Sequence, residues 1–463
     1  MDSTPFVNRH LDIPLYQQLY QFFKENMHAG RIQKGTKLPS KRLLAAQLSI
    51  SQTTVERAFE QLAAEGYLLS KPRSGWFADY DGGDFVHSEP AASPLKNPHR
   101  QETEPMIDFH FGHVDPAHFP FSAWRKSTVH RLDQDGHTLY RPGDVLGELE
   151  LRTLIADHLY QSRGVRCSPD QVVIGAGSPV LIHMLCHIFR PYAAIGFEDP
   201  GSSRSRALFE VNHLQVLPIS VDDEGICMQD IQQKQPRLLY VTPSHQFPLG
   251  TIMSINRRMQ LLKWAAAQEA FIIEDDYDGE FRYSGQPIPS LQGLDQHNRV
   301  IYMGTFSKSL LPSLRISYMI LPPHLLEKGR EIMSLYKQTV SSHSQLTLAE
   351  FMRNGEWQKH LNRMRKLYKR KRALLLEVIE STLGTRVKIR GGNSGLHLLL
   401  DVDSSFNEEE LIEKAKEQGV KIYPASVFYQ NQPPERTVLI GFAGVSEEHI
   451  REGIKKLKAA WDL

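Results

Sequence analysis

Two periodicities of apolar residues divide the chain. Near the start, Leu15, Leu19, Phe22 and Phe23 fall at i, i+4, i+7 and i+8, which places them on one face of a helix. From Ile107 onward, helical stretches instead alternate with short apolar runs that are rich in β-branched residues. The first pattern predicts a small, mainly helical domain, and the second predicts a larger α/β domain.

Two more helices and a hairpin follow in the first domain. Ser40 is placed to cap a helix over residues 41–48. Ser51 is placed to cap another helix, whose apolar face consists of Val55, Ala58, Phe59 and Leu62. Two short apolar runs then flank a basic turn at 71–75, which predicts a two-stranded wing. Three short helices and a wing describe an α+β winged helix-turn-helix, whose Ser51 helix is positioned for the major groove.

The larger domain is predicted to hold a parallel sheet. Its apolar runs are short, and each is followed by Gly, Pro, Asp or Ser; they span 172–174, 194–197, 238–241, 271–273 and 300–302. In such sheets ligands bind outside the carboxyl ends of the strands. Between the two domains, residues 79–105 are rich in Gly, Pro and charge, which predicts a flexible linker. We therefore expect a head at 1–78, a linker at 79–105 and a module at 106–463.

Charge supports a nucleic-acid surface on the head alone. The chain has 54 Lys and Arg against 53 Asp and Glu, so any basic surface must be local. Between Glu25 and Glu56 the charged residues are all basic, as phosphate contacts require. The alternative is a solvated basic face on a protein-interaction domain. The residues predicted to contact double-stranded operator DNA are Lys41, Arg42, Ser51, Gln52, Thr53, Thr54, Arg57, Lys71 and Arg73.

Other function classes find no support in the sequence. Charged residues interrupt the first thirty positions, and no apolar run is long enough to span a bilayer, so neither a signal peptide nor a membrane role is predicted. The three cysteines lie far apart without the spacing of metal ligands. We expect a cytoplasmic protein without a metal site.

A lysine follows the last of the apolar runs. Lys308 stands between two serines, with Thr305 before it and Arg315 after it. By itself this pattern also fits an ordinary surface lysine at the end of a strand. The acidic run Glu274-Asp275-Asp276-Tyr277-Asp278 follows the preceding apolar run, and by itself it suits a solvated loop or a Mg²⁺ site. A glycine turn at Gly177 follows the first apolar run. Together with the lysine they suit pyridoxal 5'-phosphate, because the lysine forms an aldimine, a carboxylate holds the pyridinium and the tyrosine bonds the ring oxygen. Arg315, Thr305 and the Gly177 turn would then bind the phosphate.

The head resembles the GntR family of bacterial repressors. The residues that carry this resemblance are Pro14-Leu15-Tyr16, Leu38-Pro39-Ser40, Arg42, Leu44-Ala45, Thr53-Thr54-Val55, Glu65-Gly66-Tyr67-Leu68 and Ser74-Gly75. The family usually has arginine after the serine that opens the recognition helix, whereas this chain has Gln52. Glutamine favours adenine where arginine favours guanine, so we expect a different operator.

The module resembles fold-type I aminotransferases, in the version fused to GntR heads that forms the MocR group of regulators. The carrying motifs are Gly175-Ala176-Gly177-Ser178, Glu198-Asp199-Pro200-Gly201, TPSHQFPLG at 242–250, EDDYD at 274–278 and GTFSKSLLPSLR at 304–315. The resemblance implies that Lys308 is the Schiff-base lysine, that Asp275 rather than Asp276 binds the pyridinium, and that Tyr277 binds the ring oxygen. It also implies that Arg315, Thr305, Ser307 and Ser178 hold the phosphate, and that the protein is a head-to-tail homodimer.

Three departures from the enzymes of this fold change the expected function. Ser202 replaces the aromatic residue that stacks on the cofactor ring, Phe247 replaces an asparagine that reaches the ring oxygen, and Leu439 replaces the arginine that binds a substrate carboxylate. These changes favour regulation over turnover. The remaining candidates for binding an effector carboxylate are Arg204, Arg206 and Arg436.

The leading hypothesis is a pyridoxal-phosphate-dependent transcription regulator that senses the cofactor itself, or an amine or amino acid, at Lys308. An amine effector would displace the lysine and change how two heads meet two half-sites. The alternative is a catalytically active aminotransferase that carries a DNA-binding head. A third hypothesis is a regulator that has lost the cofactor.

Overall fold

The computed structural model describes residues 7–9, 11–81, 106–283 and 289–463. It divides into two compact units, Met1–Gln101 and Glu102–Leu463, which are treated separately below. Most of the predicted linker lies outside the described residues. Within the described parts of the chain, no helix combines the length and the apolar character needed to cross a bilayer.

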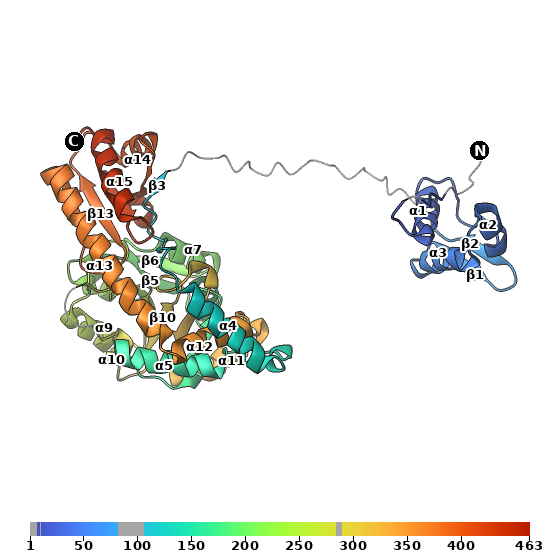
Figure 1. The fold of residues 1–463 in the computed structure, drawn as a ribbon. Helices are drawn as coiled ribbons and strands as arrows, with labels where there is room; N and C mark the ends of the chain where they lie inside the picture. The colour runs from blue at the N-terminus through green and yellow to red at the C-terminus, as the bar shows by residue number, and fades with distance from the viewer. Residues whose placement is uncertain (1–6, 10, 82–105, 284–288) are drawn as a thin grey trace. The chain divides into compact units, whose positions relative to one another are not determined.

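The first unit is the winged helix-turn-helix expected from the sequence. Helices α1 (Leu15–His28), α2 (Lys41–Leu48) and α3 (Gln52–Ala64) precede an antiparallel hairpin of β1 (Leu68–Lys71) and β2 (Gly75–Ala78) (Figure 1). Ser40 and Ser51 cap α2 and α3 by accepting hydrogen bonds from the amides of Leu43 and Thr54. The apolar stripes meet in one core, in which Leu19, Val55, Phe59 and Leu62 are fully buried.

The second unit is built on an eight-stranded sheet in the order β4-β11-β10-β9-β8-β5-β6-β7. The five predicted runs form β4 (Val172–Gly175), β5 (Ala194–Asp199), β8 (Leu238–Val241), β9 (Phe271–Asp276) and β10 (Val300–Thr305). Strands β5, β8, β9 and β10 pair in parallel. The prediction omitted β11 (Ser317–Ile320), which lies antiparallel between β4 and β10. It also omitted β6 (Gln215–Asp222) and the edge strand β7 (Gly225–Ile226), which follow β5 in the sheet.

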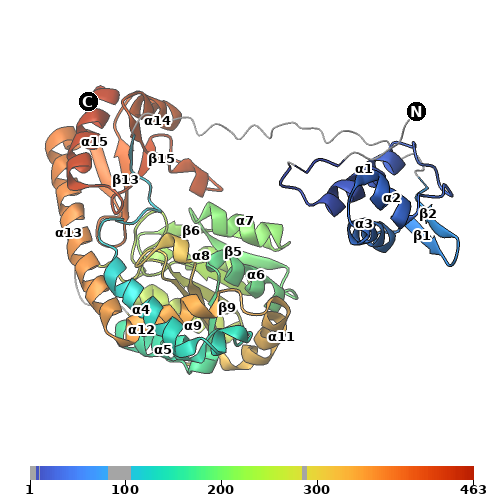
Figure 2. The same cartoon turned by 45° about the vertical axis from the view of Figure 1, so that its right-hand side comes forward.

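Helices cover both faces of this sheet (Figure 2). Side chains of β9 alternate between them: Phe271 and Ile273 pack with one helix layer, and Ile272 packs with the other. The first layer consists of α6 (Ser178–Ile188), α7 (Ser203–Val211) and α11 (Leu326–Tyr336). The second layer consists of α5 (Leu149–Arg163), α12 (Ser342–Arg353), α8 (Met228–Lys234), α9 (Ile255–Ala267) and the short α10 (Leu291–Leu294), and α4 (Phe121–Asp135) packs outside α12.

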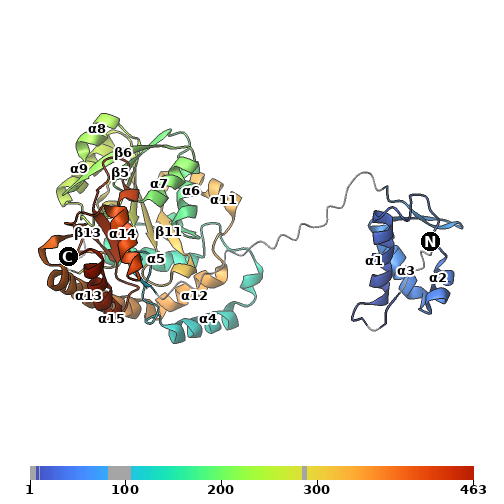
Figure 3. The same ribbon diagram turned by 90° about the horizontal axis from the view of Figure 1, so that it is seen from above.

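A smaller subdomain follows the long helix α13 (Glu356–Leu383), which packs against α15 (Glu447–Ala460) (Figure 3). Its antiparallel sheet has the order β12 (Val387–Arg390), β13 (His397–Val402), β16 (Thr437–Gly441) and β15 (Tyr423–Pro424). Helix α14 (Glu408–Glu417) precedes β14 (Val420–Lys421), which pairs in parallel with β3 (Ile107–Asp108). The segment that enters the module from the linker side is therefore tied to the subdomain.

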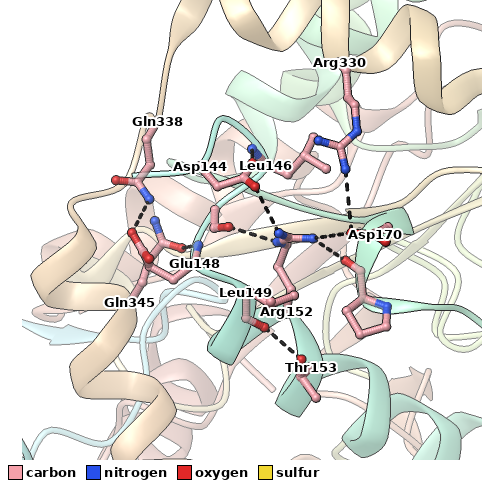
Figure 4. Close-up of polar contacts among 12 residues, drawn as sticks. Asp144, Leu146, Glu148, Leu149, Arg152, Thr153, Asp170, Arg330, Gln338 and Gln345 are labelled. Atoms are coloured by element: carbon pink, nitrogen blue, oxygen red, sulfur yellow. Dashed lines mark hydrogen bonds and ion pairs between the residues drawn. The ribbon is translucent and has the colours of Figure 1, made fainter. Parts of the chain in front are cut away.

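Arg152 on α5 ties the loop before α5 to the start of β4 (Figure 4). Its buried guanidinium donates to the carbonyls of Gly147 (2.9 Å) and Pro169 (2.7 Å) and pairs with Asp144 (3.2 Å). Gly147 has φ +103°, and a Cβ there would lie 2.7 Å from the Ile174 side chain. Arg152 thus fixes the loop beside β4, and the glycine leaves room for Ile174 on that strand.

Candidate functional site

A cavity of about 560 Å³ lies at the carboxyl ends of β9 and β10. Large-domain strands and loops supply Ser178, Ser202, Ser203, Arg204, Ser205, Tyr240, Thr242, Phe247, Asp275, Tyr277, Asp278, Ser307, Lys308, Pro312 and Arg315. The segment after β3 and the subdomain supply His110, Phe111, Gly112, His113, Leu396, His397 and Phe428. The cavity thus lies where the parallel-sheet prediction placed a ligand, and most of the predicted cofactor residues line it.

Lys308 follows β10 and presents its amine to the cavity. Its Nζ donates a hydrogen bond of 2.7 Å to the backbone carbonyl of Phe111. Desolvation lowers the pKa of the Lys308 amine to about 8, against a smaller upward effect of Asp278. At neutral pH a larger fraction of this amine than of an exposed lysine is therefore in the neutral, nucleophilic form. Nothing in the sequence indicated the contact with Phe111.

Asp275 and Asp276 point to opposite faces at the end of β9. Asp275 lines the cavity and accepts a short hydrogen bond from the Tyr240 hydroxyl, and desolvation raises its pKa to about 6. Asp276 is buried away from the cavity, where it accepts from Arg163 (2.7 Å) and from the Tyr302 hydroxyl (2.6 Å). Of these two acids, Asp275 is therefore the one that faces a ligand in the cavity.

Tyr277 is part of a buried hydrogen-bonded network. Its hydroxyl lies 2.9 Å from His245 Nδ1 and 3.0 Å from the His245 carbonyl, and the same Nδ1 lies 2.9 Å from an Asp278 oxygen. One ring nitrogen each of His245 and His397 and a carboxylate oxygen of Asp278, atoms of the kind that can coordinate a metal ion, lie within 4.8 Å of one another. Asp278 and Tyr277 both lie within hydrogen-bond distance of Nδ1, whereas the buried Nε2 of His245 has no hydrogen-bond partner among the described residues.

The predicted phosphate residues meet at one end of the cavity. Gly177 has φ +92°, and a Cβ there would lie 2.1 Å from Arg315 Nη2, so glycine leaves room for the guanidinium. Ser178 begins α6, and Ser178, Ser307 and Arg315 line the cavity. Thr305 does not line it, because its hydroxyl accepts hydrogen bonds from the Ser307 amide (3.1 Å) and the Ser317 hydroxyl (2.8 Å). Thr305 thus shapes the turn that presents Ser307 and Lys308.

The three effector candidates separate in the structure. Arg204, on α7, is exposed and lines the cavity. Arg206 does not line it, and Arg436 lies in a different hollow beside Asn407 and Glu435. Only Arg204 is therefore placed to bind a ligand carboxylate. Ser202, at the position of the usual stacking aromatic, instead caps α7 by accepting from the Ser205 amide (3.2 Å).

The predicted DNA-contacting residues lie on α2, on α3 and in the wing. Gln52, Thr53 and Arg57 are exposed along α3, Arg42 is exposed on α2, and Lys71 and Arg73 are exposed in the wing. Three others have intramolecular roles. Ser51 and Thr54 bond each other through their hydroxyls at 2.8 Å, and Lys41 pairs with Glu56. The exposed set suits the base-reading and phosphate-binding roles of a recognition helix and a wing.

The cavity fits pyridoxal phosphate. It combines a lysine amine of lowered pKa, a carboxylate facing the cavity, and an arginine–serine end where only glycine leaves space for the guanidinium. Lys308 would hold the cofactor aldehyde, Asp275 the ring nitrogen, and Arg315 with Ser178 and Ser307 the phosphate. Tyr277 would bond the ring oxygen.

Comparison with known proteins agrees with this architecture. Residues 104–457 match the family of class I and II aminotransferases, and residues 15–78 match the bacterial regulatory proteins of the gntR family. The HTH-type transcriptional regulator YdeL of Bacillus subtilis is 71% identical over the full length of both chains. The probable rhizopine catabolism regulatory protein MocR of Rhizobium meliloti is 33% identical, with 98% of this chain and 95% of MocR covered.

A solved structure resembles the module alone. Pyrococcus horikoshii kynurenine aminotransferase, crystallised with PMP (the amine form of the cofactor), superimposes with a TM-score of 0.71 at 27% identity. The match covers 78% of this chain and 92% of the enzyme. The fold, the cavity and the full-length relatives together imply pyridoxal phosphate as the cofactor. The chain belongs to the MocR group of GntR-type transcription regulators, in which a winged helix-turn-helix is fused to an aminotransferase-like domain.

Proposed function

We propose that this regulator binds operator DNA through α3 and the wing, and that its affinity for the operator is set by an amine or amino acid, or by pyridoxal phosphate itself, at Lys308. The observation that carries this proposal is the hydrogen bond from Lys308 Nζ to the Phe111 carbonyl. Pyridoxal phosphate supplies an aldehyde that a primary amine attacks, so Lys308 and an effector amine compete for one carbon.

Phe111 connects this chemistry to the route toward the head. The Lys308 amine cannot keep its bond to the Phe111 carbonyl unchanged while it also binds an aldehyde. Phe111 lies three residues after β3, which is the first element of the module after the linker, and β3 is held by β14 of the subdomain. A change at Lys308 would therefore reach the part of the module that the head is joined to. For this change to regulate DNA binding, the effector must bind with different affinity to the arrangement in which Lys308 contacts Phe111 and to the arrangement in which it does not.

We also propose that the protein acts as a head-to-tail homodimer in the cytoplasm. Two half-sites require two recognition helices, one from each chain. Exposed apolar side chains on and after α4, among them Phe121, Val129, Leu132 and Tyr140, support a self-association surface on the module. The direction of association comes from the resemblance to the MocR group.

The coupling is tested by measuring two signals on one sample. Operator fragments are first selected from a random pool with the full-length, cofactor-loaded protein. Amines and amino acids are then titrated while the visible cofactor spectrum and the anisotropy of labelled operator are followed. We expect an amine that changes the spectrum to change operator affinity by about tenfold. A spectral response without any change in DNA binding would contradict the proposal, and steady conversion to keto acid at about 1 s⁻¹ or faster would favour the aminotransferase alternative.

Replacing Arg42 with alanine should weaken binding to all DNA sequences. Arg42 is exposed on α2 and carries no ion pair among the described residues, so its charge is available to a phosphate. Losing one phosphate contact should lower the slope of log K against log salt by about 1. Binding is measured by anisotropy over a salt series. Gln52→Ala is the matched control: it should change base preference and leave the slope unaltered, and an unaltered slope in Arg42→Ala would rule out the phosphate contact.

A further inference from the structure

The cavity provides one permanent cation beyond those assigned to the cofactor. Among its lining residues the arginines and lysines are Arg204, Lys308 and Arg315. Lys308 and Arg315 are assigned to the aldehyde and the phosphate. The subdomain adds no cation, because Arg390 pairs with Asp401 (2.6 Å) and Arg436 lies in a separate hollow. A ligand with a single carboxylate can therefore pair with Arg204, whereas a second carboxylate would find no further arginine or lysine among the described residues that line the cavity.

Three phenylalanine rings form an apolar surface in the same cavity, here called the aromatic wall: Phe111, Phe247 and Phe428. Their ring centroids are 5.6 Å apart for Phe111 and Phe247, 4.8 Å for Phe247 and Phe428, and 6.0 Å for Phe111 and Phe428. Fully buried Leu399, Ala425 and Leu439 belong to the same cluster. Leu439 occupies the position where aminotransferases carry the arginine for the substrate carboxylate, so this side of the cavity is apolar in depth.

The aromatic wall and the polar groups select for opposite ends of a ligand. A charged or amide group placed against the wall would lose water without gaining a hydrogen bond, which is costly. An aromatic or branched aliphatic group there would bury apolar area and contact ring edges and faces. Lys308 Nζ lies 2.7 Å from the backbone carbonyl of Phe111, so an amine that acts at Lys308 lies beside the aromatic wall. Arg204 lines the same cavity from α7.

We propose that the effector is a primary amine or amino acid with an aromatic or bulky aliphatic body, which packs on the aromatic wall while its carboxylate, where present, binds Arg204. This deepens the proposed function and rests on it, since it assumes that an amine acts at Lys308. It excludes dicarboxylic amino acids and small polar amines as the best ligands.

Four probes separate the two contacts on the cofactor-loaded, full-length protein. L-Phenylalanine, L-glutamate, phenethylamine and ethylamine are titrated while the visible cofactor spectrum is followed. Phenethylamine should bind about tenfold or more tightly than ethylamine, because the ring buries apolar area that the methyl group lacks. L-Phenylalanine should bind more tightly than L-glutamate by a similar factor.

Paired variants assign each preference to its residue. Phe428→Ser should reduce the ratio of phenethylamine to ethylamine affinity toward one, and Phe428→Leu should retain most of it. Arg204→Gln should lower the ratio of phenylalanine to phenethylamine affinity and leave the ratio of phenethylamine to ethylamine affinity unchanged. Arg204→Lys should retain part of the phenylalanine to phenethylamine ratio and also leave the other ratio unchanged. Ratios are taken within one variant, so a loss of folded protein cancels. If Phe428→Ser does not fold, the four-probe comparison on the unsubstituted protein decides.

The outcomes distinguish this inference from the proposed function. If glutamate or ethylamine perturbs the spectrum as strongly as the aromatic probes, the inference is overturned and the amine-sensing function stands. If no amine perturbs the spectrum or operator binding while pyridoxal phosphate still binds, both amine sensing and the inference are overturned, and sensing of the cofactor itself is left. If the preference for aromatic probes is present in the unsubstituted protein and disappears in Phe428→Ser, both the inference and the proposed amine-sensing function are supported.

Discussion

Replacing Lys308 with alanine is expected to abolish the visible absorption of the lysine-bound cofactor and, with it, the response of operator binding to effectors. Lys308 is the one lysine among the described residues that line the cavity, so no other amine of that kind can take its place. The fold should survive, because the hydrogen bond of the amine is to a backbone carbonyl and leaves no charged partner behind. Absorption spectra, circular dichroism and operator anisotropy measure the three properties. Lys328→Ala, an exposed lysine on α11, is the matched control.

The assignment of Lys308 as the cofactor-binding lysine can also be tested by measuring how the rate of cofactor binding depends on pH. Burial lowers the pKa of Lys308 from 10.5 to about 8, and the neutral amine is the nucleophile. The rate at which the apo-protein captures pyridoxal phosphate should therefore rise as pH increases toward about 8 and level off above it. A rate that climbs steadily toward 10.5 would show an ordinary exposed lysine. Visible absorption that persists in Lys308→Ala would contradict the assignment of this residue.

Replacing Arg163 with leucine is expected to lower the free energy of unfolding of the module by about 3–5 kcal/mol, the usual cost of breaking a buried ion pair. Arg163 Nε donates to Asp276 at 2.7 Å, and the side chains are 8% and 2% exposed. Without the guanidinium, the Asp276 carboxylate would stay buried with the Tyr302 hydroxyl as its remaining partner among the described side chains. Urea unfolding followed by tryptophan fluorescence measures the loss.

A double variant shows whether the loss comes from the stranded charge. Asp276→Asn removes the negative charge but keeps an oxygen for the Tyr302 hydroxyl. Arg163→Leu combined with Asp276→Asn should therefore recover a large part of the stability lost in Arg163→Leu alone. Equal instability of the single and double variants would mean that lost packing, and not the buried carboxylate, dominates. Because β9 also carries Asp275, the weakened module should bind the cofactor less tightly as well.

Local patterns were sufficient for most of the secondary structure. The helical stripe of Leu19 and Phe23 and the caps at Ser40 and Ser51 depend on neighbours within a few residues, and the head folds as predicted. The runs that became β4, β5, β8, β9 and β10 were recognisable because a strand buried on both faces is apolar throughout. Strand β11 was missed because a short apolar run does not indicate whether it runs parallel or antiparallel to its neighbours. That it pairs antiparallel with β10 is known only from the hydrogen bonds between the two strands.

The sequence by itself determined which residues would gather at the cofactor site, because the carboxyl ends of parallel strands share one edge of the sheet. Tertiary structure decided their roles. Side chains alternate along β9, so adjacent Asp275 and Asp276 had to diverge, but only the packed sheet shows that Asp276 meets Arg163 on α5 while Asp275 faces the cavity.

The contacts between distant segments were likewise beyond sequence patterns. The Phe111 carbonyl at Lys308, the His245 ring at Tyr277 and the approach of Phe247 to Phe428 each join residues far apart in the chain. The same holds for the choice of Arg204 over Arg436. Hydrophobic periodicity reports on neighbours along one element, whereas these contacts depend on how the loops at the strand ends pack with one another and with the subdomain.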